Sequence, residues 1–155
     1  MSTAIAIQDR MQGNHCYGCG IDNPKGMQIK SYWDGRESLC TYQPRPEQCA
    51  GPEKYLYGGT IASLIDCHCV GTAVAHQYEL EGREIGTGEM IWCVTGRLEV
   101  DYHAPVPIDR PVRLRAVIDA VDGKKTRLTC ELSSDETLCA TGRVLAVRVP
   151  NSWRD

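Results

Sequence analysis

The chain contains no phenylalanine, and only 6% of its 155 residues are aromatic. Tyr, Trp and aliphatic side chains must therefore form the walls of any apolar binding site. No apolar run approaches the roughly 20 residues that a membrane-spanning helix needs. Positive charge is also not in excess, because the chain has 17 Lys and Arg against 20 Asp and Glu, which gives a formal net charge of −3. We therefore expect no membrane partner and no nucleic-acid partner, since the latter requires cations that neutralise phosphates.

The first ten residues lack a cationic lead, and their apolar stretch is too short for a signal peptide. The chain has nine cysteines, an odd number that cannot all pair within one molecule. Disulfides persist mainly in exported proteins. We therefore expect a cytoplasmic protein with free thiols.

No internal repeat or low-complexity tract is present, and a 42% apolar fraction suffices for one folded domain. Within this single domain, residues 1–26 are predicted to form an N-terminal arm and a Cys/Gly-rich turn block, with the main domain at residues 27–150. Residues 1–13 are expected to be a short helix or a loose arm. Two strands, at 27–33 and 37–42, are expected around Asp34-Gly35, a strong hairpin signal.

Residues 60–78 have helical length and are apolar on almost every side, which is typical of a helix inside a domain. Gly58 and Gly59 stand just before this helix and leave its first amides open to approach. Runs rich in Val, Thr, Leu and Ile then predict strands at 90–102, 112–121, 126–133 and 138–149. A single antiparallel sheet curved around one central helix satisfies this order, so the predicted class is α+β.

Asp66 is the chemically informative residue, because a carboxylate among Ile and Leu side chains is costly to bury without a partner. Helical spacing places Ser63 and Val70 on its face, whereas His68 points to nearly the opposite side. Two interpretations stay open. Asp66 is either a hydrogen-bonded structural residue, or a base or nucleophile aimed into a cleft beside the amides of Gly58-Gly59.

Three segments together resemble a known family. The run from Tyr57 through Gly58-Gly59 to Asp66 resembles the H-G-G-x-x-x-x-L-x-D block of hot-dog fold thioesterases of the phenylacetate-degradation (PaaI-like) type. Residues 94–105 are similar to that family's second block, a strand ending in Y-x-x-P. Residues 16–26 are similar to the C-x-x-C-G-x-x-N-P-x-G segment of one branch.

The resemblance implies a hot-dog fold, in which an antiparallel sheet of about six strands wraps around one long central helix. It also implies an acyl-CoA thioesterase that works as a homodimer, often paired into a homotetramer, with CoA entering as part of the substrate and no cofactor. The family's site lies between two subunits. Carried over, the Gly58 N–H polarises the thioester carbonyl, and Asp66 from the other subunit acts as general base or nucleophile.

One departure from the family pattern is Tyr57, which replaces a histidine. A phenol donates a hydrogen bond but stays neutral, so Tyr57 is expected to orient the substrate. The alternative is a protein that binds acyl-CoA or another small ligand without turnover. Gln48 is the nearest counterpart of an upstream amide helper in some relatives. The residues assigned to substrate binding are Gly59, Ser63, Tyr102 and His103, although His103 is equally well explained as a partly exposed strand histidine.

Cys16-x-x-Cys19, with His15 beside it, supplies half of a zinc ligand set. No second C-x-x-C follows, and Cys67 or Cys69 completes the set only if the N-terminal loop packs against the helix. We therefore expect no metal and a turn that docks its thiols against the domain. A redox pair is disfavoured because it belongs after a strand at a helix start. The motifs of a hot-dog dehydratase or hydratase are absent.

Overall fold

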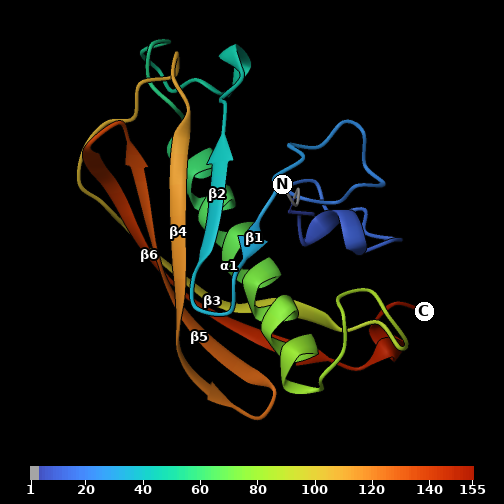
Figure 1. Cartoon of the computed structure of the whole chain (residues 1–155). Coiled ribbons are helices and arrows are strands. Elements are labelled where there is room, and N and C mark those ends of the chain that lie inside the picture. Colours follow the sequence, from blue (N-terminus) through green and yellow to red (C-terminus); the bar gives the residue numbers. More distant parts are fainter. Residues whose placement is uncertain (1–3) are drawn as a thin grey trace.

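A computed structural model describes residues 4–155 as one curved antiparallel sheet wrapped around one long helix (Figure 1). The strands follow the spatial order β1-β2-β4-β5-β6-β3. The elements are the 3-10 turns Gln8–Arg10, Pro46–Gln48 and Asn151–Trp153, the helix α1 at Gly58–Leu80, and the strands β1 (Tyr32–Trp33), β2 (Ser38–Tyr42), β3 (Trp92–Tyr102), β4 (Val112–Asp122), β5 (Lys125–Ser134) and β6 (Thr137–Val149). The expected α+β hot-dog architecture is confirmed.

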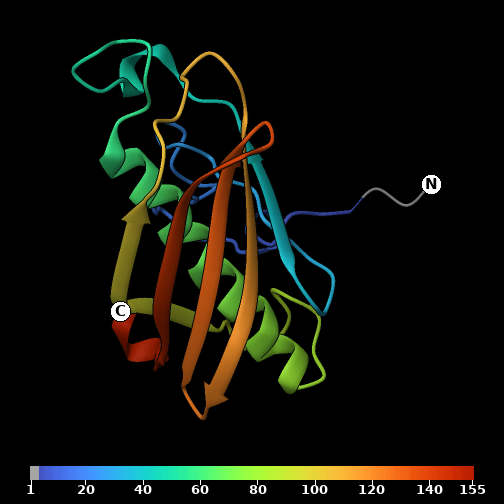
Figure 2. The same ribbon diagram turned by 90° about the vertical axis from the view of Figure 1, so that its left-hand side faces the viewer.

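The long strands form because their side chains alternate between the core and solvent. Buried and exposed residues alternate along β2 and along the first half of β4, and along nearly all of β5. All five strand pairs are antiparallel, as hairpins and short connections allow. The sheet ends at β3, which pairs only with β6 among the described strands and therefore presents an open edge (Figure 2).

Helix α1 lies in the concave face of the sheet and is buried on most sides. Leu64, Ile65 and Tyr78 are fully buried within it. The helix packs tightly on the sheet at Gly142 of β6, where an added Cβ would lie 2.3 Å from Cγ2 of Ile65. A side chain at that position would push the helix away, so glycine sets the distance between helix and sheet.

The structure corrects two sequence predictions. The strand expected from residue 27 is wrong for residues 27–31, because β1 comprises only Tyr32–Trp33. The amide of Ile29 donates to the carbonyl of Gly18 at 3.0 Å, and Gln28 has a φ of +59°, so this segment follows the N-terminal turn rather than β2. The helix also begins at Gly58 rather than Thr60, which makes the two glycines its first residues.

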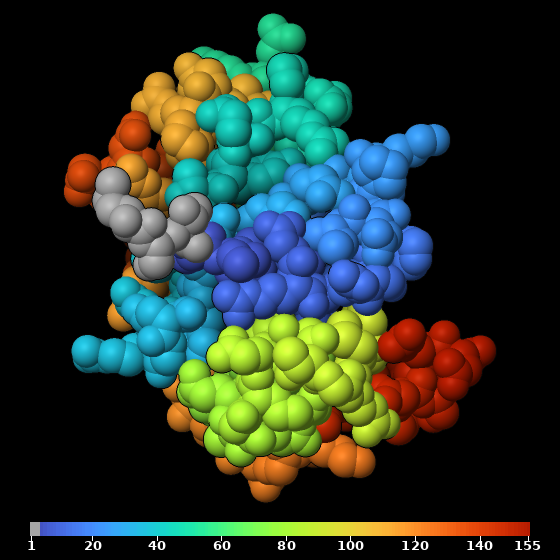
Figure 3. All heavy atoms as spheres, turned by 45° about the vertical axis from the view of Figure 1, so that its right-hand side comes forward, coloured from blue at the N-terminus to red at the C-terminus, as the bar shows by residue number. Residues whose placement is uncertain are grey.

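The N-terminal segment packs onto the domain from residue 6 onwards. Ile7 and Met11 are buried, and the buried Gln8 side chain bonds with Ser31. In Figure 3 this segment, in blue, lies directly against the yellow-green loop that follows α1. The arm is therefore not loose over residues 6–11. Residues 1–3 lie outside the described part of the chain. The division of the chain at residue 26 stays a prediction. Within residues 4–155, no helix is both long and apolar enough to cross a membrane.

Candidate active site

The first two amides of α1 make no hydrogen bond within the described part of the chain. Tyr57 is the N-cap residue, and its carbonyl accepts from the amides of Thr60 and Ile61 at 3.0 and 3.2 Å. Among the described residues, nothing accepts a hydrogen bond from the N–H groups of Gly58 and Gly59. The first amides of a helix carry a partial positive charge, so this end of α1 suits a carbonyl oxygen that becomes negative.

Two tyrosines frame these amides. The hydroxyl of Tyr102, at the end of β3, donates to the carbonyl of Gly58 at 2.7 Å. The ring of Tyr57 lies over Gly59, where an added Cβ would come within 2.3 Å of a ring carbon. Both rings are more than half exposed. The helix start therefore lies in an open, partly aromatic hollow.

Two other predicted residues, His103 and Ser63, lie near this end of α1. His103 and Tyr102 line a surface pocket of about 410 Å³ together with Gly58. The imidazole Nε2 of His103 lies 3.0 Å from the Thr141 hydroxyl. Ser63 instead donates its hydroxyl to the carbonyl of Gly59 at 2.9 Å, one turn back in the helix. Substrate binding by these residues stays a prediction.

Asp66 lies farther along α1 and is only partly buried. The hydroxyl of Thr95, on the edge strand β3, donates to Oδ1 of Asp66 at 2.6 Å. Burial raises the pKa of the Asp66 carboxyl, and the Thr95 hydrogen bond partly opposes this. The carboxylate borders a mainly apolar cavity of about 270 Å³ between α1 and β3, which Val70 and Trp92 also line.

Sequence reasoning missed Thr95. Its position depends on a β-bulge, because Thr95 pairs with Ala146 and Arg97 pairs with Leu145, which leaves Gly96 unpaired. Bulges re-aim side chains and are common beside active sites. A glycine in the middle of a long strand is the signal that indicates such a bulge from sequence alone.

Within one chain, Gly58 and Asp66 are too far apart to act on the same atom. They are separated by eight residues of continuous helix, which at 1.5 Å per residue is about 12 Å. A base and an oxyanion donor must each lie about 3 Å from the reacting groups. The described chain thus brings Tyr57, Gly58 and Tyr102 together, and places Asp66 with Thr95 elsewhere.

Two polar residues near the site have structural roles. His68 is fully buried on the opposite side of α1 from Asp66, where it bonds with the Ser31 hydroxyl and the Ser38 carbonyl. Burial lowers the pKa of His68 to about 4, so it is neutral. The side chain of Gln48 accepts from the Arg45 amide at 2.8 Å and bonds with the Tyr42 hydroxyl, so its polar atoms are already occupied.

The thiols of the N-terminal turn do reach α1. Cys16 and Cys19 lie beside Cys67, so the expected docking of the turn against the domain is confirmed. Hydrogen bonds with the thiols of Cys19 and Cys67 hold the pKa of the Cys16 thiol well below its ordinary value. All three sulfurs border the cavity that Asp66 also borders. Cys69 does not join this group, and the neighbouring Cys130 thiol and burial raise the pKa of the Cys69 thiol.

Comparison with known proteins identifies relatives of this fold. The family model of the thioesterase superfamily matches residues 53–141. A thioesterase superfamily protein from Shewanella loihica has a similar structure, with a TM-score of 0.68 and 34% identity, covering 89% of this chain and 96% of that chain. The E. coli PaaI protein from the phenylacetic acid degradation operon has a TM-score of 0.64 at 14% identity, covering 80% and 81%. At that identity the likeness shows the fold alone.

Curated relatives carry a named activity. Acyl-coenzyme A thioesterase THEM4 of Xenopus laevis is 27% identical over 104 residues, which is 65% of this chain and 39% of that protein. The protein of the same name from Bos taurus is 22% identical over 152 residues, 94% of this chain and 56% of that protein. The chain thus spans about half the length of the curated relatives it matches.

Proposed function

Because the chain belongs to the thioesterase superfamily, we propose that it hydrolyses the thioester of an acyl-CoA to a free acid and CoA. The observation that carries this proposal is the Asp66 carboxylate, held by Thr95 at the margin of an apolar cavity. The unbonded amides at the start of the same helix supply the second requirement, a donor for the thioester carbonyl. Hydrolysis needs only water besides the substrate.

The proposed site is shared between two copies of the chain. The separation of about 12 Å between Gly58 and Asp66 along one helix means that one thioester carbonyl meets both only if they come from different protomers. The open edge of β3 supports this arrangement. Thr95 to Leu98 are four consecutive exposed residues, so the middle of this strand is uncovered on both faces. We propose a two-fold dimer through β3, with a dimer of dimers as a further possibility for the assembly.

The proposed chemistry begins with Asp66 in its ionised form. It takes a proton from water, and the oxygen of that water attacks the thioester carbon. The carbonyl oxygen becomes an oxyanion that accepts from the Gly58 amide of the other protomer. When the tetrahedral intermediate collapses, the carbon–sulfur bond breaks, and the CoA thiolate receives the proton from Asp66. Base catalysis contributes about 10²–10⁴ in rate, and one oxyanion donor about 10²–10³.

Asp66 acting as a nucleophile is the alternative route to the same products. Its carboxylate then attacks the carbonyl carbon, expels the CoA thiolate and forms an anhydride that water hydrolyses. Label found on Asp66 after a single turnover in ¹⁸O-labelled water identifies this route. Direct water attack places the label only in the product acid, whereas attack of water on the Asp66 carbonyl of the anhydride leaves label on the enzyme.

Binding without turnover is the second candidate function, and the observation that favours it is Tyr57. Its exposed phenol lies beside the helix amides, and a phenol is in general a weaker proton donor to a leaving thiolate than an imidazolium. Tight binding of acyl-CoA without release of thiol would support this candidate. If the protein is an enzyme, Tyr57→His raises turnover.

The test is a panel of acyl-CoA esters assayed for free thiol with wild type and Asp66→Asn. We expect cleavage of at least one ester by wild type and a loss of about 10²–10⁴ in kcat for the variant. The matched control is Asp119→Asn, because Asp119 also accepts a 2.6 Å hydrogen bond from a threonine but lies on an exposed part of β4. Equal cleavage by wild type and Asp66→Asn would refute the role of Asp66. A cytoplasmic location remains part of the proposal.

A further inference from the structure

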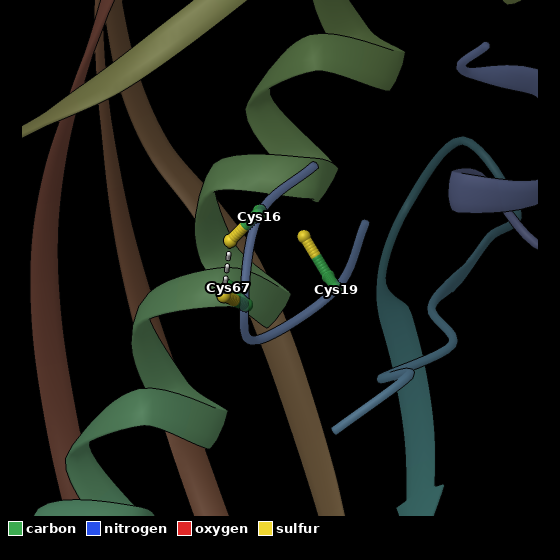
Figure 4. Close-up of side chains that lie close together, drawn as sticks. All are labelled: Cys16, Cys19 and Cys67. Carbon is green, nitrogen blue, oxygen red and sulfur yellow. Dashed lines mark hydrogen bonds between the residues drawn. The ribbon is translucent and has the colours of Figure 1, made fainter. Parts of the chain in front are cut away.

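Three cysteines from two separate parts of the sequence bring their sulfurs close together. Cys16 and Cys19 come from the N-terminal turn and Cys67 from α1, and their sulfurs all lie within 4.8 Å of one another (Figure 4). The Cys16 and Cys67 sulfurs are 3.7 Å apart. A tetrahedral zinc ion with Zn–S bonds of 2.3 Å holds its sulfurs about 3.8 Å apart. The spacing therefore suits three ligands of one ion.

The turn that carries Cys16 and Cys19 is shaped to approach the helix. Gly18 packs directly on Cys67, where an added Cβ would lie 2.3 Å from the sulfur. The carbonyl of Gly18 accepts from the Ile29 amide at 3.0 Å, which ties the turn to the segment behind it. Only a residue without a side chain lets the two elements come this close.

A polar side chain lies beside the three sulfurs. The side-chain amide of Asn14 donates to the Cys19 sulfur at 3.9 Å. Donors of this kind surround metal-bound ligands, where they stabilise negative charge and fix orientation. The three sulfurs thus have one polar donor beside them.

The site has an entry path and room for a fourth ligand. Cys16 is exposed and Cys19 partly exposed, whereas Cys67 is buried. The cavity of about 270 Å³ reaches all three residues. Among residues 4–155, no fourth His, Cys, Asp or Glu joins this group. Zinc sites with three protein ligands take water in the fourth position, and soft thiolates select zinc over hard cations.

We propose that Cys16, Cys19 and Cys67 bind one zinc ion, with a water molecule from the cavity as its fourth ligand. On binding, each thiol releases its proton and forms a bond to zinc, and no electron is transferred. The ion fixes the N-terminal turn to α1 beside Asp66, and so closes one side of the cavity. The sequence prediction of no metal rested on a ligand set that Cys16 and Cys19 leave incomplete, and the folded turn brings a third thiol, that of Cys67, beside them. This proposal is independent of thioester hydrolysis.

The first experiment measures zinc in the full chain purified under reducing conditions. We expect one zinc ion per chain in wild type. Cys16→Ser removes an exposed ligand at little risk to the core, and its zinc content falls to that of chelator-treated protein. Cys49→Ser is the matched control, because it removes a partly exposed thiol outside the cluster and keeps the metal.

The second experiment titrates metal-free protein with Co²⁺. Wild type and Cys49→Ser develop thiolate-to-cobalt charge-transfer absorption and the visible bands of a tetrahedral site, and Cys16→Ser does not. Gly18→Ala keeps every thiol but places a methyl group against the Cys67 sulfur, so its affinity for Co²⁺ falls about 10–100-fold. Adventitious binding to free thiols would not respond to this change.

The proposal is overturned by any of three results. Wild type lacks zinc and gives no cobalt–thiolate absorption, or Cys16→Ser retains the metal, or intact mass shows the loss of two hydrogens in a disulfide among these cysteines under reducing conditions. Thermal unfolding distinguishes loss of the metal from a folding defect. Chelation lowers the Tm of wild type and Cys49→Ser, whereas the Tm of Cys16→Ser does not change on chelation because this variant holds no metal.

Discussion

Gly58→Pro tests the helix amide with little other change. Proline lacks the N–H group and is favoured at the first position of a helix, which Gly58 occupies. Tyr57 has φ −63° and ψ 135°, the conformation preferred before proline. A Cβ at Gly58 would lie 3.6 Å from the ring of Tyr102, an ordinary contact. We expect normal folding and a loss of about 10²–10³ in kcat, the value of one oxyanion donor.

Gly58→Ala is the control, because it adds the same Cβ and keeps the N–H. Acyl-CoA hydrolysis is measured by release of thiol, and Tm by thermal unfolding. If Gly58→Ala loses as much activity as Gly58→Pro, the added carbon rather than the missing donor is responsible. If Gly58→Pro is fully active at unchanged Tm, the amide does not stabilise the oxyanion.

Mixed dimers extend this test to the distance of about 12 Å between Gly58 and Asp66. Gly58→Pro and Asp66→Asn are co-expressed with different affinity tags, and the mixed dimer is purified. One of its sites contains both defects, and the other contains an intact amide and an intact carboxylate. We expect about half of the wild-type activity per dimer, because one of two equivalent sites works. Activity no higher than that of the two parent variants would refute a site shared between protomers.

Three further changes test the contacts around the site. Thr95→Val removes the hydroxyl that donates to Asp66, and kcat/KM falls about tenfold, because a hydrogen bond to a partly exposed charge contributes about 1.5 kcal/mol. Gly142→Ala forces a Cβ against Ile65 and lowers the free energy of unfolding in urea by about 1–3 kcal/mol. Leu98→Asp charges the exposed edge of β3 and weakens dimerisation at least about tenfold, as measured by light scattering on dilution.

Matched controls accompany these variants. Thr129→Val removes the equivalent hydroxyl beside Asp119 and leaves activity unchanged. In Gly51→Ala the added Cβ has no atom within 4 Å, so we expect unchanged stability. Leu39→Asp charges a similarly exposed leucine on β2, toward the other end of the sheet, and leaves the dimer intact. An effect of the control equal to that of its test variant would show that the contact described here is not the cause.

Local pattern predicted most of the secondary structure. The expected helix at residues 60–78 differs from α1 by two residues at each end, and the strands after it agree to within two residues. These elements were predictable because periodicity among near neighbours determines which side chains a helix or strand can bury. Residues 27–31 were predicted incorrectly, because an extended segment becomes a strand only if a neighbour pairs with it. Ile29 bonds to the turn at Gly18 instead.

The sequence by itself pointed to Asp66, to the glycine pair Gly58-Gly59, to the neighbouring thiols of Cys16 and Cys19, and to the α+β class. Only the tertiary structure decided what these residues meet. The Thr95 hydroxyl reaches Asp66 across 29 residues, and Cys67 meets Cys16 across 51. Such contacts form only where α1, β3 and the N-terminal turn pack against one another. Sequence spacing cannot predict them, because it identifies only neighbours within about one helical turn.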